Sequence, residues 1–151
     1  MRQTLLIVHH TPSPALHSIF ESVLEGATDE QIAGVDVVAR PALAATATDV
    51  MTADAYILGT PVNLGYMSGA LKHFFDQIYY PCLESTRGRP YAFYVHGDND
   101  ATGALVAIEK ITTGLRWRMA QQPLTVMGKP TSRDLEAAWE LGAAVAAQLS
   151  E

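Results

Sequence analysis

The stretch Thr60-Pro61-Val62-Asn63-Leu64-Gly65-Tyr66-Met67-Ser68-Gly69-Ala70-Leu71-Lys72 decides the fold of this chain. The short apolar run before it, residues 53–59, is typical of a strand buried on both faces. Apolar residues then recur at the three- and four-residue spacing of a helix that lays one face on a sheet: Met67, Ala70, Leu71, Phe74, Phe75 and Ile78. The turn between strand and helix contains Pro, Asn and Gly, which fix or free the backbone and let peptide groups point outward. We expect a binding site there, because open α/β sheets bind ligands at the carboxyl ends of their strands.

The same alternation of strand and helix runs through the rest of the chain. The expected strands are residues 5–8, 35–39, 53–59, 91–95 and one within 119–127, and the expected helices are residues 14–24, 42–50, 67–78, 104–115 and 135–149. Gly26 is expected to end the first helix, and Pro123 marks the last strand as a sheet edge. Five alternating pairs predict right-handed crossovers and a parallel sheet of order 2-1-3-4-5. We therefore expect one domain over residues 1–151, an α/β doubly wound three-layer sandwich.

Composition excludes several classes of protein. A net charge of −6 over 151 residues argues against a nucleic-acid partner, which would require clustered Lys and Arg. The longest apolar runs are shorter than a membrane span, and the first residues resemble a strand more than a signal peptide. The single Cys82 cannot form an internal disulfide, which agrees with a reducing compartment. We expect a cytoplasmic protein with no membrane partner.

Residues 60–72 resemble the flavin-contacting loop of the NAD(P)H-dependent FMN reductases and related flavodoxin-like quinone reductases. In those families a Thr/Ser-Pro-x-x-x-Gly-x-Met-Ser-Gly-x-Leu-Lys run joins the third strand to the third helix. Outside this run the resemblance covers nearly the whole chain, but only as an order of strands and helices. It implies a flavodoxin-like fold, FMN as cofactor and NADPH or NADH as electron donor.

The loop after the first strand is the predicted phosphate site. A helix amino terminus carries unpaired N–H groups and a partial positive charge, which favour an anion, and the resemblance places the FMN phosphate here. Pro12 and Pro14 have no N–H to donate, and a hydrogen bond to a charged group contributes roughly 1.5–3 kcal/mol. Thr11, Ser13, Ala15 and Leu16 are expected to compensate, with His10 as a further donor. The alternative is that Ser13 and Pro14 only begin a helix.

Two further loops are expected to meet the flavin ring. By resemblance, the turn after the third strand offers backbone groups to the ring, and its residues are Pro61, Val62, Asn63, Leu64 and Gly65. The loop after the fourth strand would lie at the other side of the ring or beside the nicotinamide, through His96, Gly97, Asp98 and Asn99. The alternative for Asp98 or Asp100 is an ordinary cap of the next helix.

Other polar side chains have simpler interpretations. Lys72 matches the family's helix lysine, but an i to i+4 pair with Asp76 explains it equally well. The histidines fit no zinc spacing, so no metal site is predicted. No side chain is predicted to act as a nucleophile or essential acid, because positioning of donor and acceptor on the flavin suffices.

Two other functions remain open. A receiver domain would need acidic residues where His9 and His10 stand, a low-molecular-weight phosphatase would need a cysteine in the first loop, and a dinucleotide-binding domain would need Gly-x-Gly-x-x-Gly there. A flavodoxin-type electron carrier and a flavodoxin-like module without flavin both fit the pattern. The prediction is an FMN-dependent oxidoreductase that passes electrons from NAD(P)H to a small-molecule quinone, flavin or similar acceptor. A homodimer or homotetramer is expected from the resemblance.

Overall fold

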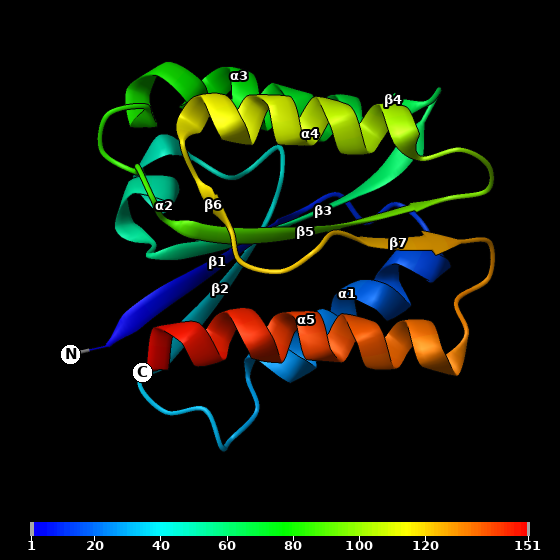
Figure 1. The fold of residues 1–151 in the computed structure, drawn as a ribbon, viewed down its shortest axis with the longest axis horizontal. Helices are drawn as coiled ribbons and strands as arrows, with labels where there is room; N and C mark the ends of the chain where they lie inside the picture. The colour runs from blue at the N-terminus through cyan, green and yellow to red at the C-terminus, as the bar shows by residue number, and fades with distance from the viewer. Residues whose placement is uncertain (1, 151) are drawn as a thin grey trace.

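A mostly parallel sheet with helices on both faces forms this protein, and the computed structural model describes residues 2–150 of it (Figure 1). The elements are β1 (Gln3–His9), α1 (Pro14–Ala27), β2 (Val35–Pro41), α2 (Ala47–Thr52), β3 (Ala55–Asn63), β4 (Tyr66–Met67), α3 (Gly69–Cys82), β5 (Pro90–Gly97), α4 (Thr102–Leu115), β6 (Arg118–Met119), β7 (Leu124–Met127) and α5 (Ser132–Ser150). The predicted α/β doubly wound, flavodoxin-like architecture is confirmed.

The order of strands is β2-β1-β3-β5-β6, with β4 paired to β3 and β7 paired to β5. When the parallel strands are numbered along the chain, with β6 and β7 together as the fifth, their order is the predicted 2-1-3-4-5. The predicted count of five strands is wrong, because residues 2–150 form seven. The extra strands have two causes. β4 forms a short antiparallel hairpin with β3, and the strand expected within residues 119–127 is divided into β6 and β7 around Pro123. Pro123 cannot donate to a sheet, so the division at this edge has a local reason.

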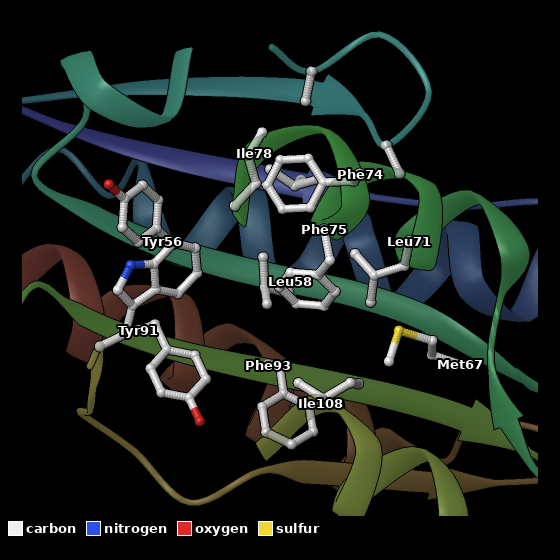
Figure 2. Packing of buried hydrophobic residues seen from close by; sticks show 14 of the residues in the cluster. Tyr56, Leu58, Met67, Leu71, Phe74, Phe75, Ile78, Tyr91, Phe93 and Ile108 are labelled. Atoms are coloured by element: carbon white, nitrogen blue, oxygen red, sulfur yellow. The ribbon is translucent and has the colours of Figure 1, made fainter. Parts of the chain in front are cut away.

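Each face of the sheet has its own core. α1 and α5 cover one face, and α2, α3 and α4 cover the other (Figure 1). Figure 2 shows the second core, in which Phe74 and Phe75 of α3 and Ile108 of α4 pack on Leu58 and Phe93 of neighbouring strands. All five of these side chains are buried. The predicted helix faces are confirmed at these positions.

Two helices differ from their expected limits. Residues 42–50 were expected to be helical, but α2 begins only at Ala47, because Thr46 and Asp49 form a capping box that fixes its start. α1 continues through Gly26, which does not end it. A Cβ at Gly26 would lie 2.0 Å from the carbonyl oxygen of Trp139, so this glycine allows α1 and α5 to pack closely. None of the helices in the range 2–150 has both the length and the apolar composition needed to cross a bilayer.

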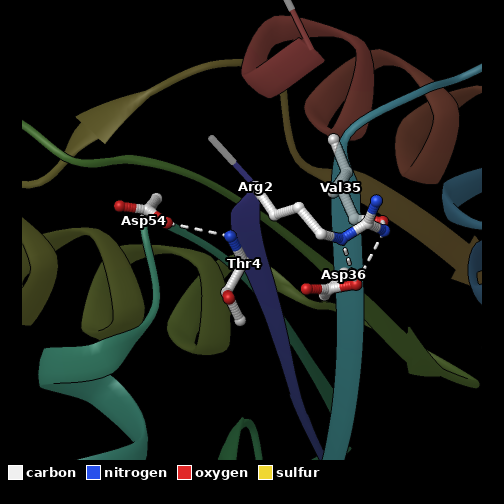
Figure 3. Close-up of polar contacts among 5 residues, drawn as sticks. All are labelled: Arg2, Thr4, Val35, Asp36 and Asp54. Carbon is white, nitrogen blue, oxygen red and sulfur yellow. Dashed lines mark hydrogen bonds and ion pairs between the residues drawn. The ribbon is translucent and has the colours of Figure 1, made fainter.

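At the amino-terminal end of the sheet, hydrogen bonds connect neighbouring segments of the chain. Figure 3 shows the amide of Thr4 donating to Asp54 at 2.8 Å and Arg2 paired with Asp36 at 2.7 Å. Nearby, Nη1 of the half-buried Arg89 lies within hydrogen-bonding distance of four oxygens: those of Val50 (3.2 Å), Met51 (2.9 Å), Ala53 (2.6 Å) and the hydroxyl of Tyr56 (3.1 Å). These contacts connect the end of α2 to β3 and β5.

Candidate functional site at the carboxyl end of the sheet

β1 lies between β2 and β3, and the chain leaves β1 and β3 toward opposite faces of the sheet. The last residue of β1, His9, is in register with Gly59 of β3. α1 then packs on one face and α3 on the other, so the segments after β1 and β3 leave the same end of the sheet toward opposite faces (Figure 1). This is the switch point at which doubly wound sheets bind ligands.

The loop after β1 ends in a well-formed helix cap. Ser13 Oγ accepts from the amide of Leu16 at 3.2 Å, and Pro14 is the first residue of α1, as predicted. The Leu16 amide is therefore occupied, and the Leu16 side chain is buried in the core. Within residues 2–150 no group accepts from the amides of Thr11, Ser13 and Ala15. Three main-chain donors, rather than four, are open at this helix terminus.

Two histidines hold this loop in place. The imidazole of His9 stacks on Phe20 with 4.0 Å between ring centroids, and its Nδ1 lies 2.7 Å from the hydroxyl of Thr11. Burial, together with the neighbouring His10, lowers the pKa of His9. His10 donates its amide to Gly59, while its Nδ1 is buried without a partner in the described part of the chain. Buried polar atoms normally have partners, and in the range 2–150 the side-chain atoms without one are this nitrogen and the core hydroxyl of Tyr94; of the two, only His10 lies in a loop at the carboxyl end of the sheet.

The segment after β3 is a hairpin rather than the open turn that the sequence suggested. Val62 and Asn63 continue β3 and pair with β4, so the true turn is only two residues, Leu64 and Gly65. These two have φ angles of 52° and 75°, which is the backbone of a type I′ hairpin turn. The Leu64 side chain is fully exposed. A leucine in the left-handed region is uncommon, and such local strain is frequent at functional sites.

Thr60 and Ser68 secure the base of the hairpin. The Thr60 hydroxyl donates to the carbonyl of Pro61 at 2.8 Å and accepts from the amide of Ser68 at 3.0 Å. Ser68 in turn caps α3 by accepting from the Leu71 amide at 3.2 Å. Met67, expected to begin the helix, lies in β4 instead. Thr60, Ser68 and Leu71 belong to the motif that resembles the FMN reductases. Their hydrogen bonds give them a structural role that is independent of any ligand.

The segment after β5 lies beside the hairpin. A Cβ at Gly97 would be 3.0 Å from the Cβ of Val62, and a Cβ at Gly103 would be 2.0 Å from the carbonyl oxygen of Gly65. The hairpin tip thus rests on the first turn of α4. His96 and Gly97 lie in β5 rather than in the predicted loop, because the strand is longer than its apolar run.

The two aspartates of this segment differ in their roles. Asp100 accepts from the Thr102 amide at 2.9 Å and from its hydroxyl, and these bonds lower the pKa of Asp100. The N-cap of α4 is Ala101, which has no side-chain cap bond, so Asp100 contacts the first helical residue from one position before the cap. Asp98 and Asn99 are exposed at the tip of the loop. Asp98 therefore remains available to a ligand.

A cavity of about 400 Å³ lies on the α1 and α5 side of the same end. It is lined by Pro14, Ala15, Ser18, His96, Asp98, Gly128, Lys129, Pro130 and Leu135. Three of the predicted site residues, Ala15, His96 and Asp98, meet here, whereas the hairpin residues 61–65 do not line it. The sequence analysis missed residues 128–130. The available signal was their position after the last strand, which places them at the same sheet end as the predicted loops.

The remaining polar candidates have structural roles. Lys72 pairs with Asp76 at 2.6 Å on the exposed face of α3, and this hydrogen bond raises the pKa of Lys72. Tyr94 is buried in the core, and its ring occupies the space that a side chain at Gly59 would need. Among residues 2–150 no three His, Cys, Asp or Glu side chains are grouped to hold a metal ion.

Comparison with known proteins agrees with this geometry. The chain matches the family described as NADPH-dependent FMN reductase over residues 9–129. A flavodoxin of Aquifex aeolicus (strain VF5) is 32% identical over 74 residues, which are 49% of this chain and 39% of that protein. This chain therefore aligns with less than half the length of that relative.

Solved structures with the same fold cover the whole chain. A flavodoxin from the domain Archaea has a TM-score of 0.79 at 17% identity and covers 99% of this chain and 100% of its own. A flavodoxin, WrbA-like protein from Agrobacterium tumefaciens has a TM-score of 0.77 at 19% identity and covers 100% of both chains. At these identities the likeness is one of fold. The family match extends from the end of β1 to the segment after β7 and includes all three predicted loops, and the chain belongs to the NADPH-dependent FMN reductase family.

Proposed function

We propose that this protein binds one FMN without a covalent bond and uses it as an NAD(P)H-dependent reductase of a quinone, a free flavin or a similar acceptor. The observation that carries the proposal is the pair of segments after β1 and β3, which present open main-chain groups at the same end of the sheet. The family match and the flavodoxin relative support FMN as the cofactor.

The first loop fits the phosphate end of FMN. The open amides of Thr11, Ser13 and Ala15 lie at the amino terminus of α1, whose first turn contains no acidic residue. The hydroxyls of Thr11 and Ser13 are further donors beside them. Three amides at a helix amino terminus suit a dianion, and the unpartnered Nδ1 of His10 lies in the same loop.

The hairpin fits the ring of FMN. Its tip residues, Leu64 and Gly65, present peptide groups at a strained turn, while Pro61 and Val62 form its buried and half-buried base. We expect Gly97 and Asn99 of the neighbouring segment to line the other side of the ring. When bound, FMN accepts a hydride from the nicotinamide and gives electrons to the acceptor, and the residues named here bind and orient it. No side chain is assigned a proton-transfer role.

A flavodoxin-type electron carrier is the second candidate, because the solved structures of like fold include flavodoxins. Such a carrier exchanges single electrons with a protein partner and does not react with NAD(P)H. The two functions share the cofactor site and differ in the reductant.

The first experiment measures flavin in the purified protein and titrates the apoprotein with FMN by quenching of flavin fluorescence. We expect one FMN per chain. Absence of saturable FMN binding would leave a flavodoxin-like module without flavin. The second experiment adds NADPH or NADH to the FMN-loaded protein without oxygen. Rapid bleaching of the flavin supports a reductase, whereas no bleaching together with full reduction by dithionite supports a carrier.

The location, the partners and the oligomeric state of the protein are part of the same proposal. We propose a cytoplasmic location and a small-molecule electron acceptor, with neither a nucleic acid nor a membrane as partner. We also propose a homodimer or homotetramer, in which exposed aromatic residues such as Tyr80 become buried. Light scattering after size-exclusion chromatography measures the mass, and a monomer at all concentrations would contradict this last proposal.

A further inference from the structure

The cavity between α1 and α5 has the walls of a small-molecule site. Pro14, Ala15, Pro130 and Leu135 give it apolar sides, and its volume is about 400 Å³. Pockets for small ligands range from about 300 to 1,000 Å³, so this one suits a compact molecule near the lower limit. The hairpin residues 61–65 do not line it, so a ligand in this cavity does not contact the hairpin, although Ala15, His96 and Asp98 of the predicted flavin site do line it.

Two unlike charges line the same cavity without pairing. Lys129 and Asp98 are both exposed at the cavity, and neither forms an ion pair with any residue in the range 2–150. A ligand with one charge would satisfy one of these side chains and leave the other without a partner. A ligand with both charges satisfies both. The charge pattern therefore favours a zwitterion.

His96 adds a hydrogen-bond acceptor. Its Nε2 lies 2.8 Å from the carbonyl oxygen of Gly128. Because a carbonyl only accepts, Nε2 carries the hydrogen in this contact, and Nδ1 of the neutral imidazole is an acceptor. The same contact joins the end of β5 to the segment after β7 and so holds Asp98 and Lys129 at one cavity. An ammonium group beside Asp98 has Nδ1 of His96 as a second acceptor.

We propose that this cavity binds a free α-amino acid with an apolar side chain. The carboxylate pairs with Lys129, the ammonium group pairs with Asp98 and His96, and the side chain packs between Pro14, Pro130 and Leu135. None of these contacts involves the hairpin. The site shares only the segment 96–98 and the first turn of α1 with the predicted flavin site.

The test is a titration of the isotopically labelled, FMN-saturated full chain with L-phenylalanine, followed by amide NMR. We expect saturable binding with a dissociation constant on the order of 1 mM, as for a ligand of this size. The shifts are expected at Ala15, Ser18 and Lys129. Two matched probes each lack one charge: 3-phenylpropanoate has no ammonium group and phenethylamine has no carboxylate. Each is expected to bind ~2–5-fold more weakly, as for the loss of one exposed ion pair.

Two variants locate the contacts. Lys129→Gln is expected to weaken binding of phenylalanine and 3-phenylpropanoate by ~2–5-fold and to leave phenethylamine unchanged. Its matched control is Lys110→Gln, at an exposed lysine of α4 that does not line the cavity. Ser18→Trp fills the cavity from the exposed face of α1 and is expected to abolish binding.

Three results would overturn the proposal. The first is no saturable binding of phenylalanine, and the second is binding no tighter than that of both singly charged probes. The third is shifts confined to residues 61–65, which would place the ligand on the hairpin. Loss of FMN binding is scored separately, from the flavin fluorescence of the same samples, so failure of this proposal is distinguishable from failure of the flavin site.

Discussion

The two ends of the sheet differ in whether their polar groups have hydrogen-bond partners within the chain. At the amino-terminal end, Asp54 accepts the Thr4 amide, and Arg89 lies against three carbonyls and the Tyr56 hydroxyl. At the carboxyl end, three amides of the first loop and Nδ1 of His10 have no partner among residues 2–150. Both ends consist of connections between the same kinds of elements. The difference is that side chains at the amino-terminal end pair with main-chain groups, whereas at the carboxyl end the buried Nδ1 of His10 has no partner and the first amides of α1 are open where a ligand is expected.

Backbone strain follows the same division. Among residues 2–150, two residues other than glycine have positive φ, Leu64 in the hairpin and Arg116 after α4. Arg116 is the left-handed cap of a helix, and its amide donates to Thr113, so its conformation closes α4. Leu64 closes no helix and buries no side chain. Its positive φ instead closes the hairpin turn between β3 and β4, where Asn, Asp or Gly is the usual residue, so the less favourable choice of residue lies at the carboxyl end.

The largest expected effect is at Arg89. Arg89→Ala removes the donor for the carbonyls at the end of α2 and leaves the Tyr56 hydroxyl without this contact, so we expect a loss of about 3 kcal/mol in the free energy of unfolding. FMN affinity should stay within about twofold, because the change lies at the opposite end of the sheet. Urea unfolding and FMN titration measure the two quantities. Arg87→Ala is the control, because Arg87 pairs only with Glu84 on the surface and should cost less than about 1 kcal/mol.

Substitutions at two glycines with similar positive φ angles distinguish an effect on stability from an effect on FMN binding. Gly65 in the hairpin and Gly34 before β2 have φ angles of 75° and 79°, and a Cβ at either would meet no atom within 4 Å. Replacing either with valine should cost about 1–2 kcal/mol of unfolding free energy, because a β-branched residue resists the left-handed region. Only Gly65→Val should weaken FMN binding, by ~10-fold, since it moves peptide groups at the hairpin tip. Equal FMN affinities for the two variants would remove the hairpin from the proposed site.

A gain of stability is expected at Leu64. Leu64→Asn places a residue that tolerates the left-handed region at a φ of 52°, and the exposed leucine loses no packing. We expect the free energy of unfolding to rise by about 0.5–1 kcal/mol. Thermal or urea unfolding of the apoprotein measures it. A decrease would show that the leucine side chain makes a stabilising contact.

The smallest expected effect is a pH dependence from His9. Burial holds the pKa of His9 below its ordinary value of 6.5, so the unfolded chain binds this proton more readily than the folded chain. Neutral His9 makes its full contribution to the free energy of unfolding above pH 6.5, and this contribution is lost as the pH falls through the lowered pKa of the folded state. Urea unfolding from about pH 8 to about pH 5 should show this loss in the natural protein. His9→Phe keeps a ring against Phe20 and should reduce the slope; an identical slope would assign it to other groups.

The site was predictable from the sequence to different degrees in its three segments. The first loop was predicted closely, because Ser13 followed by Pro14 is a local signal for a helix start and needs no distant contact. The turn after β3 was predicted in position but not in form. Val62 and Asn63 pair with Tyr66 and Met67 and so form a hairpin. A strand of two residues is too short to show an alternation of apolar and polar side chains, so the sequence pattern does not indicate this pairing.

The cavity could not be predicted. His96 was predicted to lie in a loop because the apolar run ends at Val95, whereas β5 continues to Gly97. In a strand, successive side chains alternate between faces, so the two extra residues decide which face His96 occupies. Lys129 is more than thirty positions away from Asp98 in the chain. The two residues line the same cavity only because they follow neighbouring strands.

The sequence by itself determined the alternation of strands and helices, the fold class and the stretch that carries the family resemblance, because these depend on local periodicity and on residues that are adjacent in the chain. The tertiary structure decided the hairpin at residues 64–65, the division of the last strand around Pro123 and the cavity between α1 and α5. Each of these requires main-chain pairing or packing between segments that are distant in sequence. Such contacts form only when the whole sheet is assembled.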